Sequence, residues 1–217
     1  MTNHQATKFI PALGSDLLTP LYDPLLWFMR ESRFKSDLIA QAQISKGNRV
    51  LDVGCGTGTL AIMTKRLYPK AEVVGIDADT KILGIARTKA AKTAIELAFD
   101  QGMADQLPNA DCSFDRVLSS LFLHHLSTEN KLRTIREVLR VLHTGGRFDV
   151  VDFGPPRTFY SRLVVRVTVN NEEVAANLQG LLPAMFREAG FQNVGETKQF
   201  MTVAGALSFY QGQKPDG

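Results

Sequence analysis

Short apolar runs alternate with stretches of helical periodicity from about Gly47 onward. Short apolar runs that end in glycine or polar positions are typical of buried strands, whereas apolar residues three and four apart are typical of one helix face. The predicted strands cover residues 49–53, 71–77, 95–99, 114–119 and 147–153. Strands that alternate with helices predict right-handed crossovers and a mostly parallel sheet. We therefore predict an α/β fold with a Rossmann-like, doubly wound sheet.

The helices between these strands carry start and stop signals. Asp79 or Thr80 can cap the helix that follows residues 71–77, because a side-chain oxygen there accepts a hydrogen bond from the first turn. A later helix has an apolar face formed by Leu132, Ile135, Leu139 and Leu142. We predict that Gly145 and Gly146 end this helix as a C-cap.

The two ends of the chain differ from this alternating core. Residues 25–42 predict a helix that begins within an apolar and aromatic stretch. After an irregular connection over residues 154–175, a short helix ends at Gly190. Residues 191–203 and 206–211 then predict a C-terminal antiparallel hairpin.

Composition narrows the class of protein. Lys and Arg number 25 against 22 Asp and Glu, a formal net charge of only +3, and the basic residues are scattered, which argues against nucleic acid as a partner. Cys55 and Cys112 lie in unrelated contexts, so we predict no disulfide framework and a reducing compartment. No apolar run is long enough to span a bilayer, and the N-terminus lacks the layout of a signal peptide. We expect a cytoplasmic protein.

Three closely spaced glycines follow the first predicted strand, in the sequence VLDVGCGTGTLA. They are Gly54, Gly56 and Gly58. Glycine permits sharp turns and lets a ligand approach the backbone without a Cβ in the way. A dinucleotide-binding loop would have its third glycine one residue later, where this chain has Thr59. Asp52 lies two residues before the first glycine, a place that is awkward for a pyrophosphate but suits a ligand with a positive amino group.

The second predicted strand ends in a carboxylate, Asp77, nineteen residues after Gly58. A carboxylate at this place can accept two hydrogen bonds from a ribose diol. Nicotinamide and adenosylmethionine sites share this feature, so it is weak evidence alone. Together with Asp52 and the glycine spacing, it favours a nucleoside that carries an amino-acid tail.

On these motifs the chain resembles the class I S-adenosylmethionine-dependent methyltransferases, particularly the branch of ubiquinone/menaquinone-biosynthesis enzymes and their small-molecule relatives. The resemblance covers residues 43–153, and the matching segments are VLDVGCGTGTLA, GIDAD, QGMADQLP, FDRVLSSLFLHHL and LRVLHTGGRFDVVDF. Two positions depart from the family pattern. Met103 stands where an acid usually meets the adenine amino group, so Asp105 or the backbone at Ala104 would serve that edge. His143 and Thr144 replace a lysine–proline pair at a surface turn.

The resemblance implies that the cofactor is S-adenosylmethionine. Asp52, Gly54 and Gly56 would surround its methionyl part, and Asp77 and Ala78 would bind its ribose. Met103 and Ala104 would frame its adenine, and Ser120 and Leu121 would lie beside its sulfonium end. Cys55, within the glycine loop, would also bind the cofactor. Tyr22, in the N-terminal segment, would also touch the cofactor. We predict no metal site.

Three further features have two interpretations each. His124 and His125 follow the fourth predicted strand, where a general base could face the acceptor, or they could serve packing and capping at a helix start. The aromatic group over residues 22–28 could be core packing or a lid over the substrate. Cys55 could be a nucleophile, but no partner base is indicated, so a small loop residue is the better interpretation.

The sequence thus predicts a methyltransferase in a single domain, residues 1–217. Residues 1–46 would be an N-terminal helical lid segment, residues 47–153 the cofactor-binding core, and residues 154–217 a substrate-side loop, a helix and the hairpin. We expect methyl transfer from S-adenosylmethionine to a small, uncharged or hydrophobic acceptor by in-line displacement. The alternatives are a non-catalytic S-adenosylmethionine-binding scaffold and a nicotinamide-dependent oxidoreductase. The sequence identifies no specific acceptor and does not indicate an oligomer.

Overall fold

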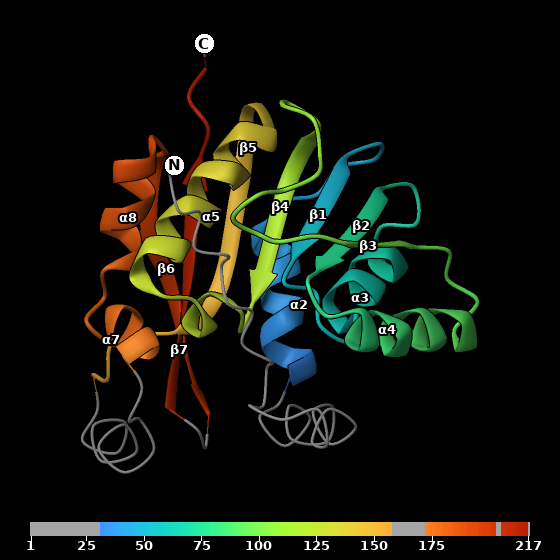
Figure 1. Cartoon of the computed structure of the whole chain (residues 1–217), viewed down its shortest axis with the longest axis horizontal. Helices are drawn as coiled ribbons and strands as arrows, with labels where there is room; N and C mark the ends of the chain where they lie inside the picture. Colours follow the sequence, from blue (N-terminus) through green and yellow to red (C-terminus); the bar gives the residue numbers. More distant parts are fainter. Residues whose placement is uncertain (1–30, 158–171, 203–204, 217) are drawn as a thin grey trace, which may run out of the picture.

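The computed structural model describes residues 31–157, 172–202 and 205–216. The strands are β1 (Arg49–Val53), β2 (Glu72–Asp77), β3 (Ala98–Gln101), β4 (Phe114–Ser120), β5 (Leu142–Phe153), β6 (Gln192–Thr202) and β7 (Gly205–Gln213). They form one sheet in the order β3-β2-β1-β4-β5-β7-β6 (Figure 1). The strands β1 to β5 are parallel, whereas β7 is antiparallel to both β5 and β6. The predicted α/β class, parallel sheet and C-terminal hairpin are therefore confirmed.

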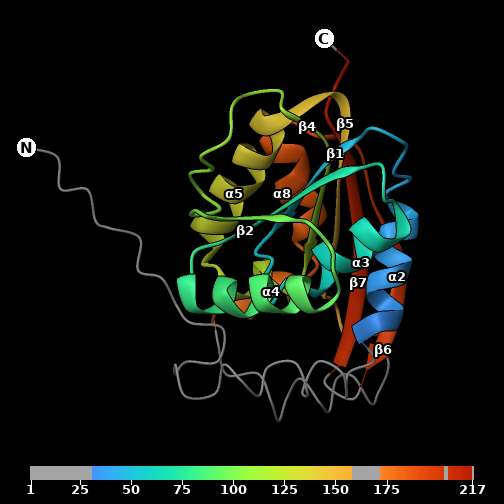
Figure 2. The same cartoon turned by 90° about the vertical axis from the view of Figure 1, so that its right-hand side faces the viewer.

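Helices cover both faces of this sheet. They are α2 (Glu31–Gln41), α3 (Thr59–Leu67), α4 (Thr80–Lys92), α5 (Thr128–Val141), α7 (Glu172–Leu178) and α8 (Leu182–Ala189), with a short 3₁₀ turn, η2 (Leu123–His125). Figure 2 shows α5 and α8 on one side of the sheet and α2 and α3 on the other. Within the described residues, no helix combines the length and the apolar character that crossing a membrane needs. The cytoplasmic location stays a prediction.

The core is divided in two by the sheet, because successive side chains of a strand point to opposite faces. On β5, Phe148 and Val150 belong to the same core cluster as Phe186 of α8, while Val151 belongs to the cluster on the other face, with Phe34 of α2. All of these side chains are fully buried. Burial of each side chain contributes about 1.5–3 kcal/mol to stability. The packing on both faces therefore holds β5, and with it the carboxyl end of the strand, in a fixed position.

Side-chain caps set the start of two helices beside that edge. The Asp79 carboxylate accepts hydrogen bonds from the backbone N–H groups of Lys81 and Ile82 at 2.8 and 3.3 Å and so begins α4. The Ser127 hydroxyl accepts from the N–H of Asn130 and begins α5. Of the two caps that the sequence allowed for α4, the structure uses Asp79.

The end of α5 differs from the sequence prediction. The helix stops at Val141, and Leu142 is already the first residue of β5, where it pairs with Phe114 of β4. Gly145 and Gly146 therefore lie inside β5, and the prediction that they cap the helix is wrong. A register shift in the β4–β5 pairing absorbs the irregular start of the strand. The left-handed φ of 71° at Gly145 explains why glycine stands there.

The two variable ends are described only in part. The helix α2 confirms the second half of the helix predicted over residues 25–42. Tyr22 and the aromatic group over residues 22–28 lie outside the described residues, so the lid remains a prediction. In the substrate-side region, α7 begins at Glu172, inside a stretch that the sequence predicted to be irregular. The division of residues 1–217 into three parts stays a prediction as well.

Candidate functional site

The predicted site residues converge at the carboxyl edge of the parallel strands. β1 has β2 on one side and β4 on the other, so the order of connections reverses between β1 and β4. Crevices outside such a reversal are the usual ligand sites of open α/β sheets. The ends of β1, β2, β4 and β5 all meet at this edge (Figure 1). The described site residues therefore come from loops that are neighbours in space.

The turn after β1 needs glycine for its backbone shape. Gly54, Gly56 and Gly58 have φ angles of 68°, 53° and 75°, in the left-handed region that side chains disfavour. At Gly58 an added Cβ would also lie 2.7 Å from the ring of Phe99. The N–H of Cys55 donates to the carbonyl of Ile76 at 2.9 Å, which fixes the turn against β2.

Asp77 links this turn to the end of β2. Its Oδ2 accepts from the N–H of Gly56 at 2.9 Å, and its Oδ1 accepts from the N–H of Asp79 at 3.0 Å. Burial raises the pKa of Asp77, and the two backbone hydrogen bonds act in the opposite direction. A carboxylate oxygen can accept more than one hydrogen bond, so both oxygens can still serve ligand hydroxyls. Ala78 follows, and its carbonyl accepts from Gln101 at 3.3 Å.

Asp52 lies beneath the glycine turn. It is only 1% exposed, and its Oδ2 accepts from the N–H of Ala61 at 3.1 Å, in the first turn of α3. Burial raises its pKa from 3.8 to about 7, and the positive charge of Lys35 on α2 partly opposes this shift. When burial raises the pKa of a carboxyl group, a cationic group nearby stabilises its ionised form. The residues present thus fit a ligand with a positive amino group.

Cys55 packs behind the turn. The residue is 6% exposed, and an added Cβ at Gly75 of β2 would lie 3.0 Å from its Sγ. Burial raises the pKa of this thiol well above 9.0, so almost no thiolate forms near neutral pH. The structure therefore supports the interpretation as a small loop residue.

The remaining predicted contacts come from two loops. Met103 forms an isolated bridge with Gln106, and Ala104 between them is buried. Ser120 ends β4, and the N–H of Leu121 donates to the carbonyl of Val151 at 2.9 Å. These backbone contacts give both loops defined positions at the edge of the sheet.

Phe122 is a site residue that the sequence analysis missed. A Cβ added at Gly54 would lie 2.1 Å from the Cγ of the Phe122 ring, so the ring covers the glycine turn. The preceding Leu121 has a φ of 52°, which is uncommon for a residue with a branched side chain. The available signal was a large aromatic residue two positions after β4, at the reversal point of the sheet.

Asp152 is a second missed residue, and it contacts a predicted one. Nδ1 of His124 lies 2.7 Å from Oδ1 of Asp152, and the N–H of His124 donates to Oδ2 at 3.2 Å. The rings of His124 and His125 lie with their centroids 4.0 Å apart, and Phe153 meets His124 edge to face at 4.9 Å. The available signal was an acid at the end of the apolar run that forms β5.

Lys131 adds a buried positive charge beside this group. Its side chain is 0% exposed, and its ammonium donates to the carbonyl of Leu126 at 2.6 Å and to that of Glu173 on α7. Burial lowers its pKa to about 8. The helical periodicity predicts Leu132 and Leu139 on the apolar face of α5, but the structure buries Lys131 and leaves both leucines partly exposed.

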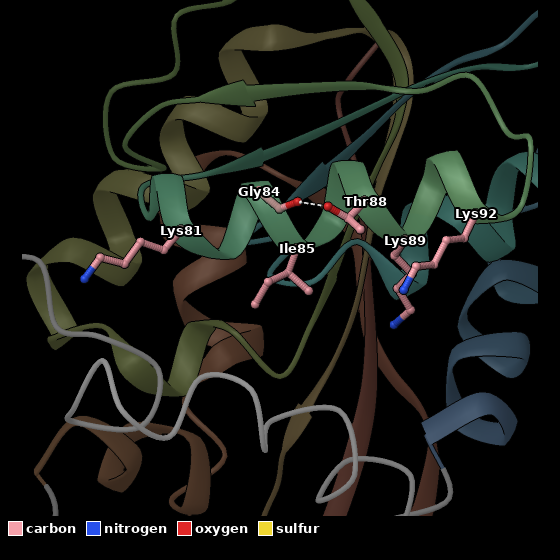
Figure 3. A pocket seen from close by; sticks show the side chains of 6 residues that line it. All are labelled: Lys81, Gly84, Ile85, Thr88, Lys89 and Lys92. Carbon is pink, nitrogen blue, oxygen red and sulfur yellow. Dashed lines mark hydrogen bonds between the residues drawn. The ribbon is translucent and has the colours of Figure 1, made fainter.

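A separate hollow of about 410 Å³ lies along α4 (Figure 3). Its lining consists of Lys81, Gly84, Ile85, Thr88, Lys89 and Lys92. It shares no residue with the predicted site. Elsewhere, within the described part of the chain, no three His, Cys, Asp or Glu side chains are grouped so that they could hold a metal ion.

Comparisons with known proteins agree with this geometry. A family model described as a methyltransferase domain matches residues 50–146. A demethylmenaquinone methyltransferase from Thermus thermophilus is 36% identical over 78% of this chain and 76% of its own length. A ubiquinone/menaquinone biosynthesis C-methyltransferase from Pseudomonas aeruginosa is 32% identical over 84% of this chain and 78% of its own length.

The fold is also that of a solved methyltransferase. The crystal structure of magnesium protoporphyrin IX methyltransferase from Synechocystis, with bound S-adenosylhomocysteine, superposes with a TM-score of 0.67 at 20% identity. The alignment covers 84% of this chain and 81% of that one. Membership of this family decides against the nicotinamide-dependent oxidoreductase and against a scaffold without catalysis. The chain belongs to the class I S-adenosylmethionine-dependent methyltransferases.

Proposed function

We propose that this enzyme methylates a small, uncharged or hydrophobic acceptor, and that the acceptor is an electron-rich ring of the hydroquinone class. The observation that carries this proposal is the 36% identity, over most of both chains, with an enzyme named for demethylmenaquinone. The aromatic and sparsely charged segment around residues 17–28 supports a hydrophobic acceptor. The acceptor residues of this family come from such variable ends.

The residues at the carboxyl edge would hold the cofactor. Asp77 would accept hydrogen bonds from the ribose hydroxyls, and the buried Asp52 would favour the amino group of the methionyl part. Met103 and Ala104 would frame the adenine, while Ser120 and Leu121 would lie beside the sulfonium end. Tyr22 would complete the site from the N-terminal segment. The raised pKa of Asp52 supports this arrangement, because a cationic neighbour relieves the cost of its burial.

S-adenosylmethionine supplies an activated methyl group on a positive sulfonium. The protein then gains most by holding the acceptor in line with that group and by excluding water. The ring of Phe122 lies against Gly54 and would help to exclude water at this point of the turn. His124 and His125 stand next along the chain in η2, and we propose that one of them handles a proton of the acceptor.

The test combines calorimetry with a transfer assay. We expect S-adenosylhomocysteine to bind and NAD not to bind at comparable concentration, because Asp52 and the glycine spacing disfavour a pyrophosphate. We expect methyl transfer from S-adenosylmethionine to a reduced naphthoquinone with an apolar tail. Equal binding of NAD would overturn the cofactor site. Binding of S-adenosylhomocysteine without transfer to any hydroquinone would overturn the acceptor class alone.

A further inference from the structure

Asp152 is held so that it can orient the imidazole of His124 in only one way. The carboxylate is 0% exposed, and each of its oxygens accepts a backbone hydrogen bond. The N–H of Phe153 donates to Oδ1 at 2.7 Å, and the N–H of His124 donates to Oδ2 at 3.2 Å. These two bonds prevent the carboxylate from turning away from the imidazole.

This geometry selects a tautomer of His124. An ionised carboxylate only accepts hydrogen bonds, so Nδ1 at 2.7 Å from Oδ1 must carry the proton. In the neutral imidazole the lone pair is then on Nε2. No hydrogen bond to Nε2 is found among the described residues, and the His124 side chain keeps 12% exposure.

The surroundings keep Asp152 ionised and give the two histidines different roles. Burial alone would raise the pKa of Asp152, but His124 beside it and the hydrogen bonds hold that pKa below its ordinary value. Burial lowers the pKa of His125 to about 3, so its neutral ring is a weak base. Within the described residues, His124 is the one of the two histidines whose ring has a carboxylate partner at hydrogen-bond distance.

We propose that His124 is the general base of the methyl transfer, that Asp152 is its positioning residue, and that the acceptor therefore loses a proton as it is methylated. The proposal rests on the function proposed above and names the role of two residues in it. A carboxylate that orients a histidine, which in turn faces the reacting group, is the arrangement that activates weak nucleophiles in many enzymes.

For a hydroquinone acceptor, each proton and each electron pair in the transfer has a source and a destination. The acceptor O–H gives its proton to Nε2 of His124, and the electron pair of that bond moves into the ring. The ring carbon forms its bond to the methyl carbon as the carbon–sulfur bond breaks, with that electron pair staying on sulfur. The methylated carbon then loses its hydrogen to water as a proton, while the oxygen takes a proton back from His124. One proton is released for each methyl group transferred.

The titratable groups around His124 come from several elements. Asp152 of β5 and His125 of η2 lie beside its ring. Lys131 of α5 and Tyr210 of β7 interact with Asp152, and Glu173 of α7 interacts with Lys131. The pH profile of the rate should change near pH 8, where Lys131 titrates.

The first experiment measures the tautomer directly, without the acceptor. Nitrogen-15 NMR of the full chain should show His124 protonated at Nδ1. In Asp152→Asn the side chain keeps one oxygen and gains one NH₂ group. Where the NH₂ faces Nδ1, it donates to that nitrogen and favours the Nε2–H tautomer; where the oxygen faces Nδ1, the NH₂ opposes the backbone N–H of His124. The preference for the Nδ1–H tautomer should therefore weaken. The matched control is Asp149→Asn. Asp149 is also on β5 and fully buried, but it pairs with Arg147 at 2.9 Å, so the His124 signal should not change.

The second experiment measures turnover with a reduced naphthoquinone as the probe. We expect His124→Gln to lower kcat by about 10²–10⁴-fold, the usual contribution of general-base catalysis. Asp152→Asn should lower kcat and shift the pH profile. In both variants calorimetry should show an unchanged affinity for S-adenosylhomocysteine.

Two outcomes overturn the proposal. One is an Nε2–H tautomer of His124 in the unaltered protein, and the other is a kcat within twofold for His124→Gln. If the unaltered enzyme binds S-adenosylhomocysteine but does not methylate the naphthoquinol, the acceptor class fails, and the tautomer measurement still decides the role of Asp152. If S-adenosylhomocysteine does not bind at all, the site assignment itself has failed.

Discussion

The aromatic ring of Phe122 lies against the α-carbon of Gly54, with 2.1 Å between the ring Cγ and the position that a Cβ would take. The two residues belong to the ends of β4 and β1, the strands between which the sheet reverses its order. The left-handed φ of 52° at Leu121 turns the chain immediately before the ring. Gly54 is therefore required twice, once by its own φ of 68° and once by this contact.

We predict that Gly54→Ala both destabilises the protein and weakens cofactor binding. The left-handed backbone costs a residue with a Cβ about 1–2 kcal/mol, and the clash with Phe122 adds to this cost or displaces the ring. Thermal melts and calorimetry with S-adenosylhomocysteine measure the two effects separately.

The double variant Gly54→Ala with Phe122→Ala separates the contact from the backbone strain. Removal of the ring should recover the part of the loss that came from the clash, because neighbouring substitutions of this kind are not additive. An additive double variant would show that the ring does not press on the turn in solution.

A second prediction concerns the stability of Asp52→Asn as a function of pH. The pKa of Asp52 in the folded chain is raised from 3.8 to about 7. The folded state thus binds this proton more tightly than the unfolded state does. The contribution of the bound proton to the free energy of unfolding is therefore lost as pH rises through 7. At about 1.36 kcal/mol for each pKa unit, ionised Asp52 costs at most about 4 kcal/mol above that pH.

Asp52→Asn should therefore be more stable than the unaltered protein at pH 8 without ligand, and the difference should shrink as pH falls toward 4. The amide oxygen can still accept from the N–H of Ala61. Urea unfolding across this pH range measures the difference, and a constant difference would contradict the prediction. At pH 8 the same variant should bind S-adenosylhomocysteine more weakly, because the charge that favours the amino group is gone.

The local signals in the sequence were sufficient for most of the fold. The cap at Asp79 and the C-cap at Gly190 depend on neighbouring residues, so the sequence pattern contains them. The end of α5 was misplaced because Leu142 pairs with Phe114, and a strand partner at that distance overrides the local signal of two glycines.

The missed site residues share a physical reason. Phe122 and Asp152 act through partners that are distant in sequence, Gly54 and His124, and only the packed sheet brings them together. Lys131 lies in a helix among polar residues, so its pattern predicts a solvent-exposed side chain. A buried lysine needs acceptors from another segment, here the carbonyl of Glu173, and no sequence pattern predicts such a contact.

A third prediction follows from the buried ammonium of Lys131. Its pKa is lowered from 10.5 to about 8, so between these values the unfolded chain binds the proton more tightly than the folded one. By linkage, this residue makes the folded state more stable as pH rises from 8 to 10.5. In Lys131→Met that dependence should disappear, and the advantage of the unaltered protein should grow with pH.

The variant also leaves the carbonyls of Leu126 and Glu173 without this donor, which costs about 1–3 kcal/mol for each buried group. Urea unfolding of both proteins at pH 7, 8, 9 and 10 gives the difference at each pH. A difference that stays flat or falls as pH rises would show that the ammonium is not buried in solution.

The last prediction separates ligand binding from folding at the end of β2. A charged hydrogen bond contributes about 1.5–3 kcal/mol, so Asp77→Ala should weaken the binding of S-adenosylhomocysteine by roughly tenfold to a few hundredfold. Part of this loss comes from the turn, since the N–H of Gly56 donates to Asp77. Asp77→Asn should lose less, because the amide keeps one acceptor oxygen.

Asp79 is the matched control, two residues away on the same loop. Its Oδ1 accepts from the N–H groups of both Lys81 and Ile82, so Asp79→Ala should cost about 1 kcal/mol of stability through loss of the α4 cap, with little change in affinity. Isothermal titration beside thermal melts of the three variants gives both quantities. If Asp79→Ala loses affinity while Asp77→Ala keeps it, the ribose is bound by the helix cap and not by the strand end. If neither loses affinity, the ribose is held elsewhere, and the placement of the whole cofactor at this edge is wrong.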